Sequence, residues 1–296
     1  MKTIHASTNA PNLSTGLLSI RKLNVDLNQG FERHWHSRDA FRSAYFNALS
    51  MSFPEGEQRF IESVQACAKL LPDEPHFAAL HEQIRDFSAQ EATHRHMHVQ
   101  YNRQLLQQGL VNQWEPRIVE RFAAAADINP LHHLAVTAAY EHYTAVLAQV
   151  MLDRPGMMAD AQPQMQQLWM WHSLEETEHK AVAFDLYQAL SGSYKWRVRW
   201  FIYATLTFAS DAMRQTVSNL WHDGTLFKPS TWWSAAKFFF GRPGDKVHAT
   251  GNGWIWLCAG HLREYLRKDF HPWQQNNRAQ ADAYAKAHHS QWRVVR

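Results

Sequence analysis

Residues 77–105 read FAALHEQIRDFSAQEATHRHMHVQYNRQL, and this stretch decides the fold class. Its apolar residues recur every three or four positions, which is the period of a helix that buries one face. One glutamate and two histidines stand in the centre of this otherwise apolar face. The face consists of Phe77, Leu80, Ile84, Phe87, Glu91, His94, His98, Tyr101 and Leu105. We therefore expect a long helix that carries three polar side chains into the interior of a helical protein.

Residues 163–190 repeat this arrangement. Their buried face consists of Met165, Trp169, His172, Glu176, His179, Ala183, Leu186 and Leu190. A carboxylate and an imidazole three positions apart project from the same face of a helix. Burial of unpaired ionisable groups is costly, and a bound metal ion would compensate for it. The pairs Glu91/His94 and Glu176/His179 therefore predict a metal site between the two helices.

Two further expected helices, 39–71 and 130–153, each place one glutamate, Glu57 and Glu141, on an apolar face. The order along the chain is thus Glu, Glu-x-x-His, Glu, Glu-x-x-His, which is the ligand set of di-iron and di-manganese carboxylate bundles. Carboxylates and imidazoles suit iron and manganese. We predict two metal ions, iron first, with manganese or zinc as alternatives. Buried Glu–His hydrogen bonds without a metal are the other interpretation.

Three more side chains face the predicted site. His172 lies one turn before Glu176, and His98 lies one turn after His94. Each could be a seventh ligand, a hydrogen-bond partner of a ligand or a proton shuttle. We favour the ligand role for His172 and the partner role for His98, and we take His172, His98 and Tyr101 as catalytic candidates. Buried tyrosines such as Tyr101 more often pack with a tethered hydroxyl.

Other titratable side chains fall outside these faces, and we expect no role for them in the site. Those expected on a solvated face are His96, Glu175 and Glu178. Those expected at the surface or with satisfied hydrogen bonds are His132, His133 and His142.

The pattern as a whole predicts an all-α fold, a ferritin-like four-helix bundle with additional C-terminal helices. Residues 1–16 are expected to be a disordered lead, and residues 17–296 a single helical domain. Within it, 39–190 form the metal-binding bundle and 194–296 an aromatic-rich helical extension. The expected helices are 39–71 with a restart or kink at Pro54 and Gly56, 76–108, 117–126, 130–153, 163–190, 196–221, 231–240 and 254–268. Residues 17–27 alternate as an extended segment, but we expect no sheet, because no comparable second strand follows.

Composition limits the class of protein. Hydrophobic residues make up 45% and charged residues 19% of the chain, so it can bury a large core. A net charge of +3 gives no electrostatic case for nucleic acid. Cys67 and Cys258 are far apart, as expected for reduced thiols in a cytoplasmic protein. No secretory signal is expected at the N-terminus, and the longest uncharged apolar run is about half of what a membrane span needs.

The chain resembles the bacterial family of predicted metal-dependent hydrolases. The matching stretches are FPEGEQRF at 53–60, QEATHRHMHVQYN at 90–102, AAYEHYTA at 138–145, WHSLEETEHKAVAFDLY at 171–187 and YLRKDFHPW at 265–273. This resemblance implies a metal more firmly than it implies hydrolysis. The ligand spacing is also similar to that of ferritin-like di-iron N-oxygenases, which add a histidine one turn before the final Glu-x-x-His. That resemblance implies that His172 is an extra ligand.

Our leading hypothesis from the sequence is a di-iron oxygenase or oxidase that activates dioxygen on an apolar or aromatic small molecule with an external electron donor. The alternatives are a dinuclear metal-dependent hydrolase and a non-catalytic metal-binding bundle. The aromatic residues of the extension could line a substrate channel, pack as ordinary core or contact a membrane surface. No nucleic acid partner is expected, and a homodimer stays open.

Overall fold

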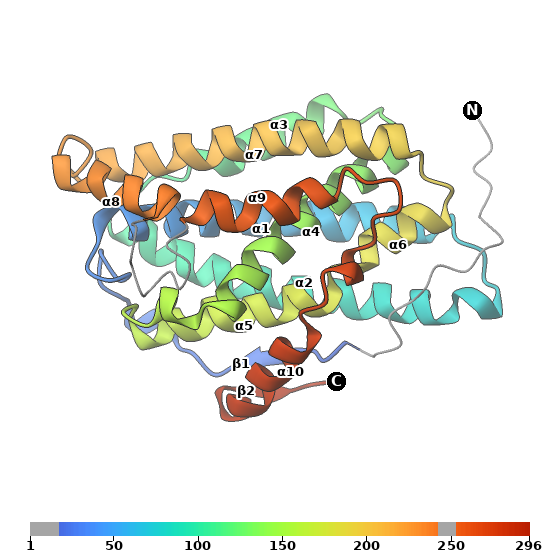
Figure 1. Cartoon of the computed structure of the whole chain (residues 1–296), viewed down its shortest axis with the longest axis horizontal. Helices are drawn as coiled ribbons and strands as arrows, with labels where there is room; N and C mark the ends of the chain where they lie inside the picture. The colour runs from blue at the N-terminus through green and yellow to red at the C-terminus, as the bar shows by residue number, and fades with distance from the viewer. Residues whose placement is uncertain (1–17, 242–252) are drawn as a thin grey trace.

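The computed structural model describes residues 18–241 and 253–296, and helices dominate this part of the chain (Figure 1). The helices are α1 Ala40–Ala68, α2 Ala78–Gln107, α3 Trp114–Ala124, α4 Pro130–Asp153, α5 Pro163–His179, α6 Val182–Ala189, α7 Tyr194–His222, α8 Pro229–Phe240, α9 Trp254–Glu264 and α10 Arg278–Ala287. Two short strands accompany them, β1 Arg21–Leu23 and β2 Trp292–Val294. The predicted all-α class is confirmed. The expected lead, 1–16, lies outside the described residues.

The centre of the molecule is formed by α1, α2, α4 and α5. Helix α1 packs along α2 and α4, and α5 packs along α4 and against α2. Helix α7 covers α1 and α4 on one side, whereas the strands and α10 lie on the opposite side, against α2 and α5 (Figure 1). Helices α8 and α9 pack on each other and extend this covering layer over α1 and α4. Four helices therefore enclose one interior, as the periodic faces predicted.

Helix α1 continues through Pro54, so the expected restart at Pro54 and Gly56 does not occur. The Asp39 carboxylate caps the helix by accepting a hydrogen bond from the Arg42 amide. Proline has no N–H group, so Pro54 cannot donate to the carbonyl of Ser50, four residues earlier. The side-chain amide of Asn102 donates to that carbonyl instead, at 2.9 Å. A contact from α2 thus replaces the lost helical hydrogen bond.

The predicted helix 163–190 is two helices, α5 and α6, interrupted at Lys180 and Ala181. The sequence carries no glycine or proline there that would indicate a break. Lys180 is 4% exposed, and its ammonium group donates to the Gln275 carbonyl at 2.6 Å and to Asn277 Oδ1 at 2.7 Å. Contacts with a distant segment accompany the interruption, which is why local periodicity missed it.

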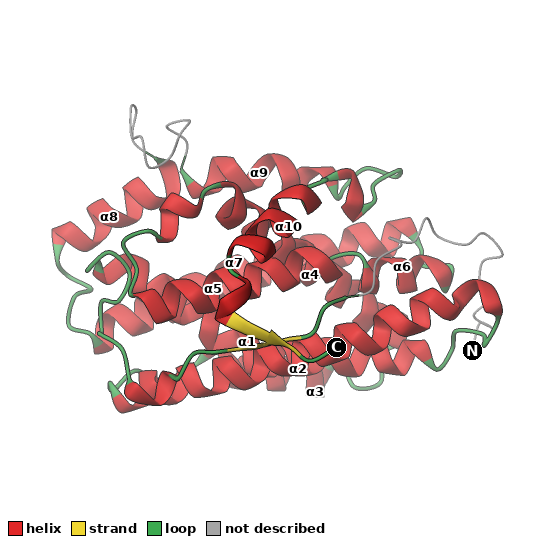
Figure 2. Cartoon of the chain, turned by 90° about the horizontal axis from the view of Figure 1, so that it is seen from below, coloured by secondary structure: helices red, strands yellow, loops and turns green. Residues whose placement is uncertain are grey.

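The expectation of no sheet is wrong. Strand β1 pairs antiparallel with β2, with Arg21 opposite Val294 and Leu23 opposite Trp292 (Figure 2). The extended character of residues 17–27 was predicted, but the partner strand lies within residues 194–296, which were expected to be a helical extension. Pairing between strands this far apart in the sequence leaves no local pattern that could indicate it.

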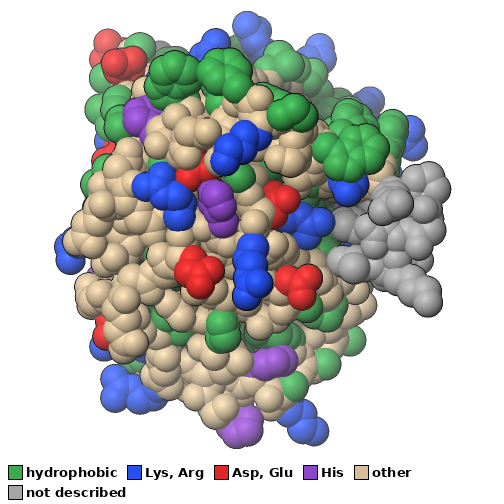
Figure 3. Space-filling view, turned by 90° about the vertical axis from the view of Figure 1, so that its left-hand side faces the viewer, with side chains coloured by type: hydrophobic (Ala, Val, Ile, Leu, Met, Phe, Trp, Pro, Cys, Tyr) green, Lys and Arg blue, Asp and Glu red, His purple; other side chains and the backbone are tan. Residues whose placement is uncertain are grey.

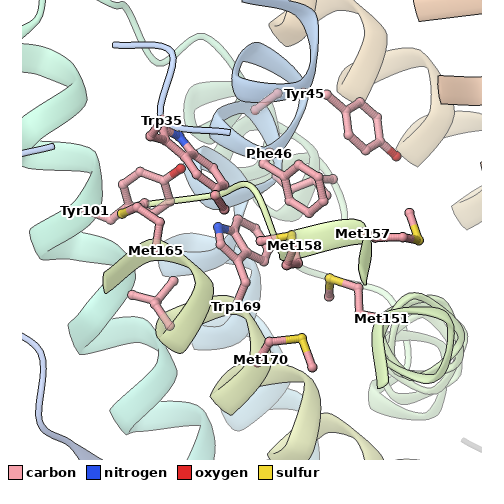
Figure 4. Close-up of a cluster of buried hydrophobic side chains, with 14 of the residues drawn as sticks. Trp35, Tyr45, Phe46, Tyr101, Met151, Met157, Met158, Met165, Trp169 and Met170 are labelled. Atoms are coloured by element: carbon pink, nitrogen blue, oxygen red, sulfur yellow. The ribbon is translucent and has the colours of Figure 1, made fainter. Parts of the chain in front are cut away.

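Aromatic and methionine side chains fill the core beside the ends of α1 and α5. Trp169 lies between Phe46 and the methionines of α5 (Figure 4). The Trp169 and Phe46 rings meet edge to face, with their centroids 5.0 Å apart. Tyr101 belongs to the same core and is fully buried. Flexible methionine side chains fill the irregular gaps between such large rings. In the described part of the chain, no helix is both long and apolar enough to span a membrane.

Candidate metal centre

Seven predicted ligands converge in the interior of the four central helices. Helix α1 supplies one of them, α2 two, α4 one and α5 three, and none is more than 4% exposed. They are Glu57, Glu91, His94, Glu141, His172, Glu176 and His179. Because α1, α2, α4 and α5 pack pairwise, side chains on their inward faces must meet.

The ligand atoms form two groups. Glu57, His94 and His172 each offer an atom within 4.8 Å of the others, and so do Glu91, Glu176 and His179. The seventh side chain, Glu141, approaches the second group, with its Oε2 atom 3.5 Å from His179 Nε2. The arrangement therefore has two sub-sites rather than one.

Glu176 joins the two sub-sites. Its Oε1 atom lies 2.9 Å from His172 Nε2 and 3.6 Å from His94 Nδ1, in the first group. Its Oε2 atom lies 3.5 Å from His179 Nε2, in the second. A carboxylate with one oxygen in each sub-site has the geometry of a bridging ligand.

The unpartnered atoms of this cluster fit a metal. Buried polar atoms normally find hydrogen-bond partners. Within the cluster, the atoms that lack one are both carboxylate oxygens of Glu57, Glu91 and Glu141, Oε2 of Glu176, Nδ1 of His94 and Nε2 of His179. All are oxygen or imidazole nitrogen atoms, the donors that manganese, iron and zinc accept. Their accumulation at one place fits a cation-binding site.

Two side chains behind the ligands fix the histidine rings. Glu175 Oε2 lies 3.0 Å from His94 Nε2, and Gln90 Oε1 lies 3.0 Å from His179 Nδ1. Each bond uses the ring nitrogen remote from the cluster, so Nδ1 of His94 and Nε2 of His179 point inward. Such outer partners set the tautomer and orientation of metal-binding histidines.

Glu175 was expected on a solvated face, and that expectation is wrong. Its side chain is fully buried, and its Oε1 atom accepts a hydrogen bond from the Arg21 amide at 3.0 Å. The Arg21 guanidinium forms a bidentate pair with Glu178 at 2.7 and 2.8 Å. The helical face of Glu175 is buried because β1 covers it, and no periodicity within α5 reveals a strand from elsewhere.

His98 and Tyr101 lie beyond His172. His98 Nε2 is 2.8 Å from His172 Nδ1, and its Nδ1 atom is 2.8 Å from the Ser50 hydroxyl. The Tyr101 hydroxyl donates to Asn47 Oδ1 at 2.7 Å. His98 therefore holds His172 from behind, whereas Tyr101 is tethered in the core. Their catalytic roles stay predictions.

Burial and mutual repulsion shift the cluster's protonation equilibria. Burial, reinforced by neighbouring carboxylates, raises the pKa of Glu57 and Glu141 well above its usual range. Burial also raises the pKa of Glu176, but the facing His179 and His172 outweigh this effect and lower it well below that range. Burial and then the neighbouring His172 lower the pKa of His94, which favours the neutral imidazole that binds metals.

The remaining predicted residues are dispersed. His96 is exposed, as expected, whereas Glu178 is partly buried against Arg21. His142 is buried, with Nε2 3.1 Å from the His261 carbonyl, which agrees with a satisfied histidine. His132 and His133 line the cavity described next.

A cavity of about 340 Å³ adjoins the cluster between α1, α3, α4 and α7. Glu57 and Glu176 are the two cluster residues that line it. Its other walls are mostly aromatic, with Phe53, Phe60, Phe122, Tyr140, Trp200 and Phe208 among them. Volumes of this order are typical of small-molecule sites. The sequence pattern did not indicate that α3 would form one wall.

The aromatic extension divides between three environments. Trp200 lines the cavity, as one of the open alternatives proposed, whereas Phe238 and Trp254 pack in the core. Trp233 and Trp256 are 63% and 58% exposed. Figure 3 shows hydrophobic side chains along the upper part of one end of the molecule, above a central group of charged ones. Most of the extension therefore does not line the cavity.

The fold and the cluster define a helical protein with a buried carboxylate–histidine centre. The chain belongs to a family described as predicted metal-dependent hydrolase, whose sequence model matches residues 19–276. This confirms the resemblance drawn from the motifs. No curated protein and no solved structure matches the chain.

The family match overturns our leading functional hypothesis. A di-iron oxygenase or oxidase that activates dioxygen with an external electron donor has no support, and hydrolysis, the alternative, is favoured. Ligand spacing involves only a few positions, whereas the longer motifs extend along most of the chain and belong to the hydrolase family. Coordination by the same residue types is compatible with more than one reaction.

Proposed function

We propose that this protein is a hydrolase that works with two divalent metal ions. Glu57, His94 and His172 would hold one ion, and Glu91, Glu141 and His179 the other. Glu176 would contribute to both. The observation that carries the proposal is the group of buried, unpartnered oxygen and nitrogen atoms in two sub-sites joined by Glu176.

Charge balance supports a pair of ions. Glu57, Glu91, Glu141 and Glu176 carry four negative charges when ionised, and two divalent cations carry four positive charges. Repulsion between four buried carboxylates would otherwise have to be relieved by protons. Mn²⁺, Zn²⁺ and Fe²⁺ are the candidates that suit this donor set.

When bound, such ions supply Lewis acidity to the substrate and lower the pKa of water, which makes water a nucleophile at neutral pH. The chain itself supplies orientation and proton transfer. Glu57 belongs to the cluster and also lines the cavity, and neither of its carboxylate oxygens has a hydrogen-bond partner. We assign it the proton that leaves water and later joins the leaving group. Gln90 and Glu175 hold the histidine rings in place.

Metal content tests the ligand assignment. Protein purified from a metal-replete medium should contain about two equivalents of metal by elemental analysis. Glu176→Ala should lose most of it, because one substitution removes the side chain shared by both sub-sites. Glu62→Ala is the matched control, since Glu62 is an exposed glutamate on α1 and is not one of the predicted ligands. It should keep the full metal content.

Full metal content in Glu176→Ala would refute the ligand assignment. The reaction is tested separately, with the Mn²⁺-, Zn²⁺- or Fe²⁺-loaded protein and a panel of esters and amides. A loaded protein that cleaves none of them would count against hydrolysis but not against the metal centre.

A further inference from the structure

We infer that the cavity beside the metal centre binds the apolar part of an uncharged carboxylic ester or amide. This inference rests on the proposed hydrolase function and specifies its substrate class.

The walls offer apolar surface over most of the cavity. Phe53 and Phe60 of α1, Ile118 and Phe122 of α3 and Phe208 of α7 are among them. Faces and edges of aromatic rings bind flat or chain-like apolar groups through their area and geometry. At roughly 30 Å³ for each water-sized group, the volume corresponds to about eleven such groups. A medium-length acyl chain or a small fused aromatic ring system matches that size.

The cationic wall residue already has an anionic partner. Arg121 pairs with the buried Asp211 of α7, which also accepts from Arg117 Nε at 2.8 Å. A carboxylate or phosphate on the substrate would have to compete with that pair. The cavity therefore favours an uncharged substrate.

The uncharged polar wall groups are mostly engaged as well. The hydroxyl of Ser52 donates to the Leu49 carbonyl, and that of Thr144 to the Glu141 carbonyl. Tyr140 and Thr207 share a hydrogen bond at 3.0 Å. Burying additional polar groups of a substrate here would leave them without partners, which is costly. Glu57 and Glu176 are the lining residues that belong to the metal cluster. A substrate with one polar group, the group that is hydrolysed, therefore fits the cavity best.

The exposed fractions of the lining residues indicate how a substrate would be oriented in the cavity. Ile128 and Tyr203 are 38% and 41% exposed and mark the opening, whereas Glu57 and Glu176 are 2% and 3% exposed and mark the inner end. An ester would enter with its carbonyl group toward the two carboxylates and its apolar part along the walls. Hydrolysis forms a bond from the acyl carbon to the oxygen of water and breaks the bond to the leaving oxygen or nitrogen. One proton of water goes to that leaving atom.

Gly56 is the position at which cavity length can be changed. It lines the cavity on α1, and a Cβ atom placed on it would meet no heavy atom within 4 Å. A larger side chain there would project into the space for the substrate. Gly260, on the exposed surface of α9, also has open space at its Cβ position and offers a matched control.

Binding of N-phenyl-1-naphthylamine, an uncharged fluorescent probe, tests the cavity without any reaction. We expect wild-type and Gly260→Phe proteins to bind one equivalent equally well. Gly56→Phe should weaken binding by about tenfold or more, and Gly56→Ala by less, because added side-chain volume overfills the site. Ile118→Trp, in the wall formed by α3, should also weaken binding and covers the case in which Gly56→Phe does not fold. Undiminished binding in every folded cavity variant would overturn the inference.

Hydrolysis of 4-nitrophenyl esters by the metal-loaded protein tests the substrate class. Wild-type protein should prefer octanoate to acetate in kcat/KM by about a hundredfold or more, since six additional methylene groups are buried. Gly56→Phe should lose most of this preference while its metal content is unchanged. An unchanged preference in Gly56→Phe would overturn the cavity assignment. Normal probe binding with no ester or amide cleaved would instead overturn the hydrolase function, and the ester assignment with it.

Discussion

Glu175 acts on the metal centre without belonging to it. Its carboxylate touches one ring nitrogen of His94 and thereby leaves the other directed at the cluster. Hydrogen bonds of this kind also raise the basicity of the imidazole. The Glu175 carboxylate thus connects β1, the strand that carries Arg21, with His94 in the cluster.

Glu175→Gln should weaken metal binding by about ten- to a hundredfold. The amide keeps the shape of the side chain but loses the charge that favours the correct imidazole tautomer. Metal affinity is measured by competition with a chelator of known affinity. Glu62→Gln, an exposed change on α1, is the control. Equal affinities for Glu175→Gln and the control would show that His94 needs no such partner.

His36 should make the protein sensitive to acid. Burial, with a smaller contribution from Arg42, lowers the pKa of His36 from 6.5 to about 3 in the folded state. The folded protein therefore favours neutral His36, so this contribution to stability is complete above pH 6.5, declines as the pH falls below 6.5, and is fully lost by about pH 3. Between about pH 6 and 4, the free energy of unfolding of His36→Gln should fall less steeply with decreasing pH than that of the wild type. The difference in slope should be up to about 1.4 kcal/mol per pH unit. Urea unfolding at several pH values measures this slope, and parallel curves for both proteins would contradict the assignment.

Helix α1 depends on α2 for one of its backbone hydrogen bonds. Asn102→Ala removes the donor to the Ser50 carbonyl and should destabilise the protein by about 1–3 kcal/mol, because a buried acceptor loses its partner. In a Pro54→Ala background the cost should be smaller, since the amide of residue 54 can then donate to that carbonyl. Urea unfolding of the two single variants and the double variant gives the coupling. Additive effects would show that Pro54 and Asn102 act independently.

The long helices were predictable because their signals are local. The apolar faces of α2 and α4 and the caps at Asp39 and Asn129 lie within a few residues of the structure they specify. Apolar faces of the same kind on α1, α2, α4 and α5 predicted that Glu57, Glu91, Glu141 and Glu176 would lie together. The break at Lys180, strand β2 and the burial of Glu175 depend on segments far away in the sequence, so periodicity could not reveal them. The cavity depends on how α3 and α7 pack, which is also a tertiary property.

At the scale of the whole molecule, the paired strands should matter for both stability and the site. Trp292 of β2 is 6% exposed and packs beside Arg21. Trp292→Ala should lower the free energy of unfolding by about 3–5 kcal/mol, as expected for loss of a large buried ring. It should also weaken metal binding, because Arg21 holds Glu175. Trp256→Ala, at an exposed tryptophan of α9, should change stability by no more than about 0.5 kcal/mol.

Urea unfolding and chelator competition measure these two effects. A Trp292→Ala protein that is destabilised but binds metal like the wild type would show that the strands support the fold alone.

The pairing of β1 with β2 also imposes an order on the folding of the protein during its synthesis. During synthesis, β2 leaves the ribosome after every helix that carries a predicted ligand. The ligand helices can therefore assemble while Arg21 still lacks its strand partner and Glu175 lacks its fixed neighbour. Full metal affinity would then arise only at the end of folding, and a nascent chain would hold its metal more weakly than the finished molecule.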